Sequence, residues 1–145
     1  MTTRQRKPAD SQLPSRVKEL RHIKASSLLP NPRNWRKHPP AQQAALRGVL
    51  AEIGYADALL ARETPDGLML IDGHLRAGLD PNQVVPVLIL DLDEQEADKL
   101  LLTLDPLAAM AHPDQDALMS LLANVTFEAP GAEAVNAMLE ALANG

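Results

Sequence analysis

The chain has 145 residues and a mass of 15.7 kDa, enough for one compact domain with tails and too short for two full domains. Because 46% of the residues are hydrophobic and only 2% are aromatic, the core must be aliphatic. The chain has no cysteine, which excludes disulfides, thiolate metal sites and a cysteine nucleophile and suits a reducing cytoplasm. The net charge is −5, and no apolar run approaches the roughly 20 residues needed to cross a bilayer, so we expect neither a membrane partner nor a secretory signal.

Charge is distributed very unevenly along the chain. Residues 1–40 contain ten of the fourteen Lys and Arg against two acidic residues, a net charge of about +8, whereas residues 41–145 carry about −13. A basic arm on an acidic body favours attraction to a polyanion such as DNA, and a solvated tail that only aids solubility explains it equally well. Residues 1–18 are polar and poor in apolar side chains, and we expect them to form a disordered basic arm.

A small mixed α/β domain is expected over residues 19–104. It begins with a short strand over Arg21–Ser26, where apolar and polar side chains alternate. A proline-stiffened, basic loop follows as far as His38, because each proline lacks an N–H and restricts the residue before it. A helix then opens at Pro39-Pro40 and ends at Gly54, with its apolar residues on one face.

A β-hairpin is expected next. Two apolar runs, Leu59–Arg62 and Leu68–Ile71, flank the turn-forming Pro65-Asp66-Gly67. One or two helical turns are expected over residues 77–79, and Val84–Leu90 reads as a buried strand.

The last third of the chain is predicted to be helical. Asp93 and Glu96 have the spacing of a capping box, so a helix begins there, and Asp105-Pro106 is expected to break it. We assign residues 105–145 to a helical C-terminal extension. Two further amphipathic helices are predicted over Asp114–Asn124 and Ala132–Ala143. Their apolar faces fit a core, a self-association surface or a docking face for a protein partner.

The segment Asp72-Gly73-His74-Leu75-Arg76 carries the strongest chemical signal. Free N–H groups where a strand passes into a helix favour an anion. The planar guanidinium of Arg76 suits phosphate oxygens, and His74 can donate to phosphate or transfer a proton. An ordinary strand-to-helix turn with a solvated arginine explains the same residues.

The loop from Asn31 to His38 is a second candidate, because its two prolines reduce the entropy lost when a ligand is held. The candidate contacts to a base or ribose are Asn31 and Asn34, those to phosphate are Arg33 and Arg36, and Trp35 is a candidate for stacking. The candidate contacts to nucleic acid are Arg33, Trp35, Arg36 and Lys37. The alternative is a surface loop whose tryptophan folds back onto the body.

Taken in order, several segments resemble the N-terminal domain of the ParB/sulfiredoxin superfamily. These are Ile23–Pro32, the helix ending at Gly54, the hairpin, Leu70–Arg76 and Val85–Val87. The Asp-Gly-His-x-Arg form resembles the stand-alone ParB-like (ParB-like nuclease) type, and the likeness covers Leu20 to Leu104. It implies a small mixed sheet with flanking helices and a nucleotide site. The implied site places phosphate contacts at Gly73, His74 and Arg76, loop contacts at Asn31, Arg33 and Asn34, and Gly54 close to the same pocket.

The resemblance leads to three functional hypotheses. The first is a nucleotide-binding module that acts as a switch or accessory factor in a DNA-associated process, with an NTP of unidentified base as ligand and Mg²⁺ as its companion ion. The second is an NTP-dependent phosphotransferase or weak nuclease that uses His74 as catalytic acid or base in the same pocket. The third is a non-catalytic protein-interaction domain. No residues have the spacing of a protein-held metal site, and without cysteine the sulfinic-acid repair of sulfiredoxin is excluded.

Overall fold

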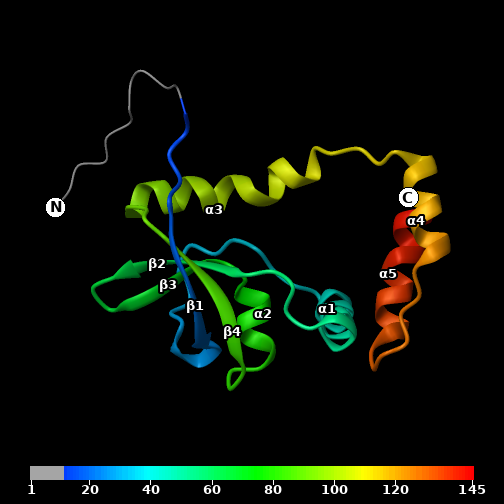
Figure 1. The fold of residues 1–145 in the computed structure, drawn as a ribbon, viewed down its shortest axis with the longest axis horizontal. Coiled ribbons are helices and arrows are strands. Elements are labelled where there is room, and N and C mark those ends of the chain that lie inside the picture. The colour runs from blue at the N-terminus through cyan, green and yellow to red at the C-terminus, as the bar shows by residue number, and fades with distance from the viewer. Residues whose placement is uncertain (1–11) are drawn as a thin grey trace.

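A four-stranded mixed sheet in the order β1-β4-β2-β3 organises the fold of the computed structural model, which describes residues 12–145 (Figure 1). β4 pairs antiparallel with β1 and parallel with β2, and β2 pairs antiparallel with β3. The strands are β1 (Val17–Lys24), β2 (Leu59–Thr64), β3 (Gly67–Asp72) and β4 (Val84–Leu90). The mixed α/β class is therefore confirmed.

Helices cover both faces of this sheet and extend beyond it. A 3-10 turn, η1 (Ala25–Ser27), follows β1, and the helices are α1 (Pro40–Ile53), α2 (His74–Leu79), α3 (Glu94–Ala109), α4 (Gln115–Asn124) and α5 (Ala132–Asn144). The predicted helix before Gly54, the hairpin, the short helix before Asp80 and the two C-terminal helices are all present. The predicted capping box is present as well, because the side chain of Asp93 accepts from the Glu96 amide and Glu96 accepts from the Asp93 amide.

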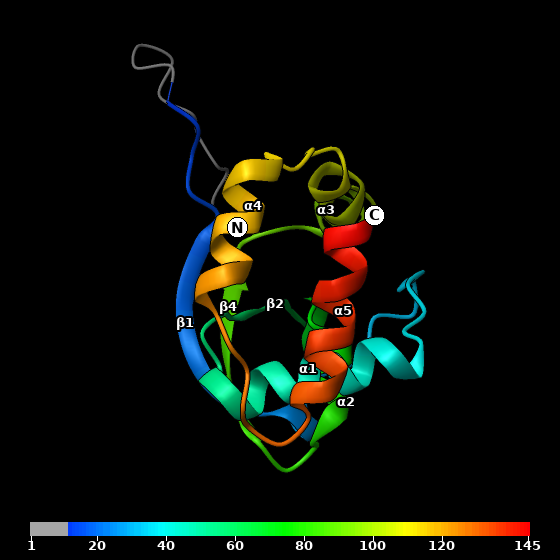
Figure 2. The same cartoon turned by 90° about the vertical axis from the view of Figure 1, so that its right-hand side faces the viewer.

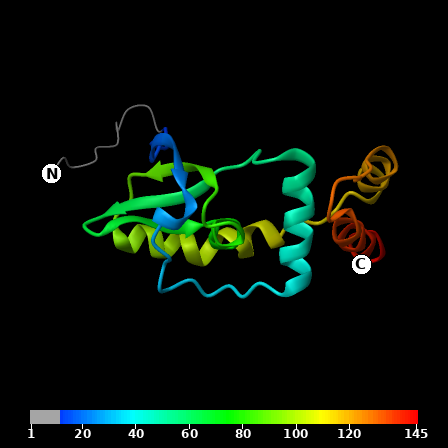
Figure 3. The same cartoon turned by 90° about the horizontal axis from the view of Figure 1, so that it is seen from below.

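The core forms two layers because successive side chains of a strand point to opposite faces. On β4, Val87 and Ile89 belong to one cluster with η1 and α2, whereas Leu88 and Leu90 face the other cluster with α3. On β3, Ile71 is fully buried against α3. Figure 3 shows α3 along one side of the sheet.

Helix α5 packs on α1 rather than on the sheet, and α4 packs on α5 (Figures 2 and 3). The contact is close because it is made by glycines: a Cβ on Gly48 would lie 2.5 Å from the Gly131 carbonyl oxygen and from Val135 Cγ2. The carboxylate of Glu52 accepts hydrogen bonds from the backbone amides of Glu128 and Ala129, at 3.1 and 2.6 Å. This contact joins the extension to the helix that follows the candidate loop.

Two boundaries differ from the predictions. β1 begins at Val17, four residues earlier than expected, and ends at Lys24, because it pairs along the whole of β4. The expected helix break at Asp105-Pro106 is wrong, since α3 continues through Pro106 to Ala109. The carbonyl of Leu102 that loses its i+4 partner at this proline belongs to an exposed residue, so water can satisfy it. Of the basic arm predicted to be disordered over residues 1–18, residues 1–11 lie outside the described residues, whereas Val17 and Lys18 begin β1, because this strand pairs with β4 and belongs to the sheet.

The two-layer core predicts a large effect for a substitution at Ile71. Ile71→Ala leaves a cavity between β3 and α3, and we expect the free energy of unfolding to fall by about 2–5 kcal/mol in urea denaturation. The matched control is Ile53→Ala, at a side chain that is 62% exposed, with an expected change within about 0.5 kcal/mol. Equal losses in the two variants would contradict the assigned core.

Candidate functional site

The turn from β3 into α2 depends on Gly73. Its φ of 103° lies in the left-handed region, and an added Cβ would sit 2.4 Å from Leu59 Cγ on the neighbouring strand. This tight turn places Asp72, His74 and Arg76 around one point. With six residues, α2 is too short for its dipole to be the main attraction for an anion.

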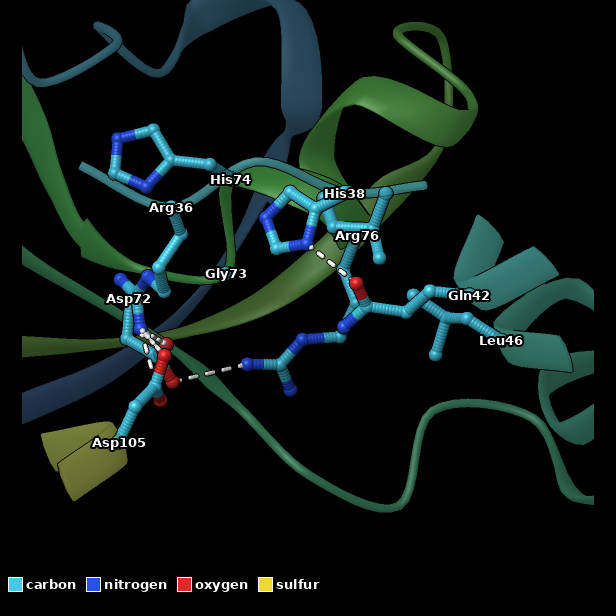
Figure 4. A pocket seen from close by; sticks show the side chains of 10 residues that line it. Arg36, His38, Gln42, Leu46, Asp72, Gly73, His74, Arg76 and Asp105 are labelled. Atoms are coloured by element: carbon cyan, nitrogen blue, oxygen red, sulfur yellow. Dashed lines mark hydrogen bonds and ion pairs between the residues drawn. The ribbon is translucent and has the colours of Figure 1, made fainter. Parts of the chain in front are cut away.

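A cavity of about 200 Å³ lies beside this turn, and Figure 4 shows its side chains. It brings together the predicted loop, the start of α1, the turn and α3. Its lining residues are Arg36, His38, Gln42, Leu46, Asp72, Gly73, His74, Leu75, Arg76 and Asp105. The two candidate segments of the sequence therefore do meet, through Arg36 on one side and Gly73, His74 and Arg76 on the other.

Two guanidinium groups share one carboxylate in this cavity (Figure 4). Arg36 Nη1 lies 3.2 Å from Asp72 Oδ1, and Arg76 Nη2 lies 3.3 Å from Asp72 Oδ2. Arg36 Nη2 also donates to the Ile71 carbonyl at 3.2 Å. The side chains of Arg36 and Arg76 are 11% and 14% exposed, so the alternative of a solvated arginine does not hold.

Each guanidinium has a second, more exposed carboxylate partner. Arg36 Nη1 lies 3.1 Å from both carboxylate oxygens of Asp105, on α3. Arg76 Nη1 lies 3.1 Å from Asp57, in the connection between α1 and β2. In the absence of a ligand, the positive charge of the cavity is therefore neutralised within the chain.

His74 joins the turn to the loop. Its Nε2 accepts a hydrogen bond from the Asn31 amide at 3.0 Å, and its buried Nδ1 has no hydrogen-bond partner among residues 12–145. Burial lowers the pKa of His74 below its usual value, the Arg36 guanidinium lowers it further, and Asp72 opposes the shift. His74 is therefore a neutral ring at pH 7, with its proton on Nδ1.

The other predicted loop residues are not in this cavity. Asn31 and Arg33 line a second cavity of about 210 Å³ next to the β2–β3 hairpin and the start of α3. Arg33 pairs there with Asp98 at 2.8 Å. Asn34 accepts from the Arg36 amide at 3.4 Å, so it shapes the loop around that arginine.

Three more predicted residues lie outside the cavity lining. Trp35 donates from Nε1 to the Leu101 carbonyl on α3 at 3.1 Å and stays 51% exposed, so the tryptophan turns back onto the body as one alternative anticipated. Lys37 is exposed in the same loop. Gly54 ends α1 with a φ of 83° and has open space around it.

Several residues that complete the cavity have no recognisable signal in the sequence. Asp57 and Asp105 are surface acids by every local criterion, and only the tertiary fold brings them to the arginines. His38 Nδ1 lies 2.9 Å from Gln42 Oε1, a contact that the i, i+4 spacing at the start of the helix could have revealed. Asp72 lies within the predicted phosphate-binding segment Asp72–Arg76, but its position in the sequence predicts no role for it.

Neither a metal site nor a membrane span is found within residues 12–145. No group of three or more His, Asp or Glu side chains among them is arranged to hold a metal ion. None of the helices formed by these residues is both long and apolar enough to cross a bilayer.

Comparison with known proteins supports the fold. No family model and no curated protein sequence matches the chain. Among solved structures, the chain is similar to the C-terminally truncated chromosome-partitioning protein ParB from Caulobacter crescentus complexed with CTP-γ-S, with a TM-score of 0.56 and 19% sequence identity. The match covers 71% of this chain and 61% of that one, so the chain spans about three fifths of the length of its solved neighbour. The fold is thus ParB-like.

The half-buried, neutral ring of His74 predicts a pH dependence of stability. Because its pKa is lower in the folded chain than the usual 6.5, the unfolded chain binds the proton first as the pH falls below about 6.5, and stability falls with it. In urea denaturation between pH 7.5 and 5.5, His74→Gln is expected to have a shallower decline than the wild type. His22→Gln, at an exposed histidine, is the matched control. An unchanged slope in His74→Gln would contradict the assignment.

Proposed function

We propose that the protein is a ParB-like nucleotide-binding module that acts as a switch or accessory factor in a DNA-associated process. The stand-alone Asp-Gly-His-x-Arg type is part of the proposal. The observation that carries it is the convergence of Arg36 and Arg76, from segments 40 residues apart, on one cavity beside the Gly73 turn. Paired planar guanidinium groups are suited to the oxygens of a polyphosphate.

The size of the surrounding space supports a ligand larger than phosphate. A neighbouring cavity of about 360 Å³ lies between α1 and α2 and shares His38, His74 and Leu75 with the arginine cavity. Together the two spaces fall within the range of small-molecule sites, about 300–1,000 Å³. Phosphates would occupy the arginine end, and the nucleoside would lie along α1 and α2, where Gln43 and Arg47 offer polar contacts.

A nucleotide would bring its own metal ion. Because residues 12–145 lack a cluster of three metal-binding side chains, Mg²⁺ would be held chiefly by phosphate oxygens and water, as is usual for this ion. The enzymatic alternative stays a prediction. It assigns proton transfer to His74, whose Nε2 is occupied by the Asn31 amide.

The DNA-associated part of the proposal rests on the basic N-terminal third. Five of the seven Lys and Arg in residues 12–40 are already ion-paired, four of them with carboxylates outside this segment. Lys24 and Lys37 are exposed and form no ion pair with any residue of the range 12–145. These two side chains, with Arg4, Arg6 and Lys7 of the predicted arm, are the candidates for contact with DNA phosphates.

Nucleotide binding is tested by isothermal titration with each of the four NTPs in the presence of Mg²⁺. Arg76→Ala is expected to weaken binding about 10- to 100-fold, because it removes a charge-assisted contact to phosphate. The matched control is Arg21→Ala on the edge strand β1, where the arginine pairs with Glu19, outside the cavity lining. No heat with any NTP for the wild type, or equal affinities in the two variants, would refute the proposed site.

DNA binding is tested by fluorescence polarisation of a labelled duplex between 50 and 200 mM salt. Lys37→Ala is expected to weaken binding at every sequence and to reduce the slope of log K against log salt by about 1. Lys99→Ala, on the acidic helix α3, is the matched control. A salt slope in Lys37→Ala equal to that of the wild type would remove Lys37 from the interface.

A further inference from the structure

The outer ends of the two cavity arginines are covered by carboxylates that belong to distant parts of the chain. Asp105, on α3, is 51% exposed and contacts Arg36 Nη1 with both oxygens at 3.1 Å. Asp57 is 84% exposed and contacts Arg76 Nη1, also at 3.1 Å. The inner contacts of the same arginines go to the less exposed Asp72. The two outer carboxylates are therefore the partners that an entering anion can replace most easily.

We propose that Asp105 is an internal competitor of the ligand and sets the affinity of the site for phosphate. Its carboxylate holds the position on Arg36 that a phosphate group would take, because carboxylate and phosphate oxygens make the same charge-assisted hydrogen bonds to a guanidinium. This inference rests on the proposed nucleotide-binding function and adds its regulation by a residue of the same chain.

The way in which Asp105 is held makes it an effective competitor. It lies within α3, and one turn earlier the carbonyl of Leu101 accepts a hydrogen bond from Trp35, the residue beside Arg36. The helix therefore keeps the carboxylate close to the guanidinium even when their ion pair opens, which gives a high effective concentration. Asp57 is not part of a helix or strand and is more exposed, so its competition at Arg76 is weaker.

Replacing Asp105 by a ligand phosphate at Arg36 costs little free energy. Asp105 is half exposed, so its ion pair with Arg36 adds little net stability and a polyphosphate that contacts both arginines can displace it. After displacement the carboxylate still lies near the bound phosphate and repels it. Removing the charge while keeping the shape of the side chain therefore favours the bound state twice, by abolishing the competition and the repulsion.

The experiment measures binding of sodium pyrophosphate by isothermal titration to the full chain, with circular dichroism of each variant to check its fold. Asp105→Asn is expected to bind about two- to fivefold more tightly than the wild type. Asp98→Asn is the matched control, because it removes the same charge from the same helix and breaks the ion pair of Arg33, which is outside the arginine cavity. Its affinity is expected to equal that of the wild type.

A second variant covers the case in which Asp105→Asn does not fold. Asp57→Asn is expected to tighten pyrophosphate binding by a smaller factor than Asp105→Asn. If the wild type binds pyrophosphate and both variants bind it equally or more weakly, the competition is refuted while the proposed function stands. If tightening is the same in Asp98→Asn, the effect is one of net charge and the role of Asp105 is refuted. If no form of the chain binds pyrophosphate, both proposals fail.

Discussion

The carboxylate of Asp72 is the contact on which the candidate site depends. It ends β3, and it holds Arg36 from the loop and Arg76 from α2 on its two oxygens. Its removal would leave both guanidinium groups with only their more exposed partners, Asp105 and Asp57. Asp72 therefore connects the loop, the turn and α2 through one side chain, and Arg36 extends the connection to α3 through Asp105.

The sheet provides the rigid support for this arrangement. β3 is an edge strand next to β2. Leu59 on β2 and Ile71 on β3 are fully buried and pack into the two layers of the core, one in each. The loop before the site is attached to the same edge, because the Leu29 amide donates to the Leu68 carbonyl and the Leu70 amide donates to the Leu29 carbonyl. A proline-rich segment without regular structure thus reaches the cavity with little freedom.

The sequence predicted those elements whose signals are local. The Pro65–Gly67 turn, the capping box at Asp93 and the glycine after α1 each act through a few neighbouring residues, so they could be recognised without a structure. The start of β1 was missed because it is set by pairing with β4, about 70 residues away. The meeting of the loop with the Gly73 turn was anticipated only through the family resemblance, which placed Asn31, Arg33 and Asn34 there rather than Arg36. Arg33 lies in another cavity, where it pairs with Asp98.

Most of the basic side chains in residues 12–40 are already paired with carboxylates, so an anion that binds them must replace an existing partner. The composition suggests a positive region facing a negative one, but in residues 12–40 most cations are already paired, and the acids that pair them come largely from the body. An anion that enters the cavity therefore meets guanidinium groups that already donate hydrogen bonds to carboxylates. Its free energy of binding is the difference between its own contacts and the carboxylate contacts that it replaces. Under the proposed function, such a site would favour ligands by the number and spacing of their negative charges, because a ligand that replaces both Asp57 and Asp105 gains contacts to two guanidinium groups. A single phosphate offers one such replacement, and a polyphosphate offers two.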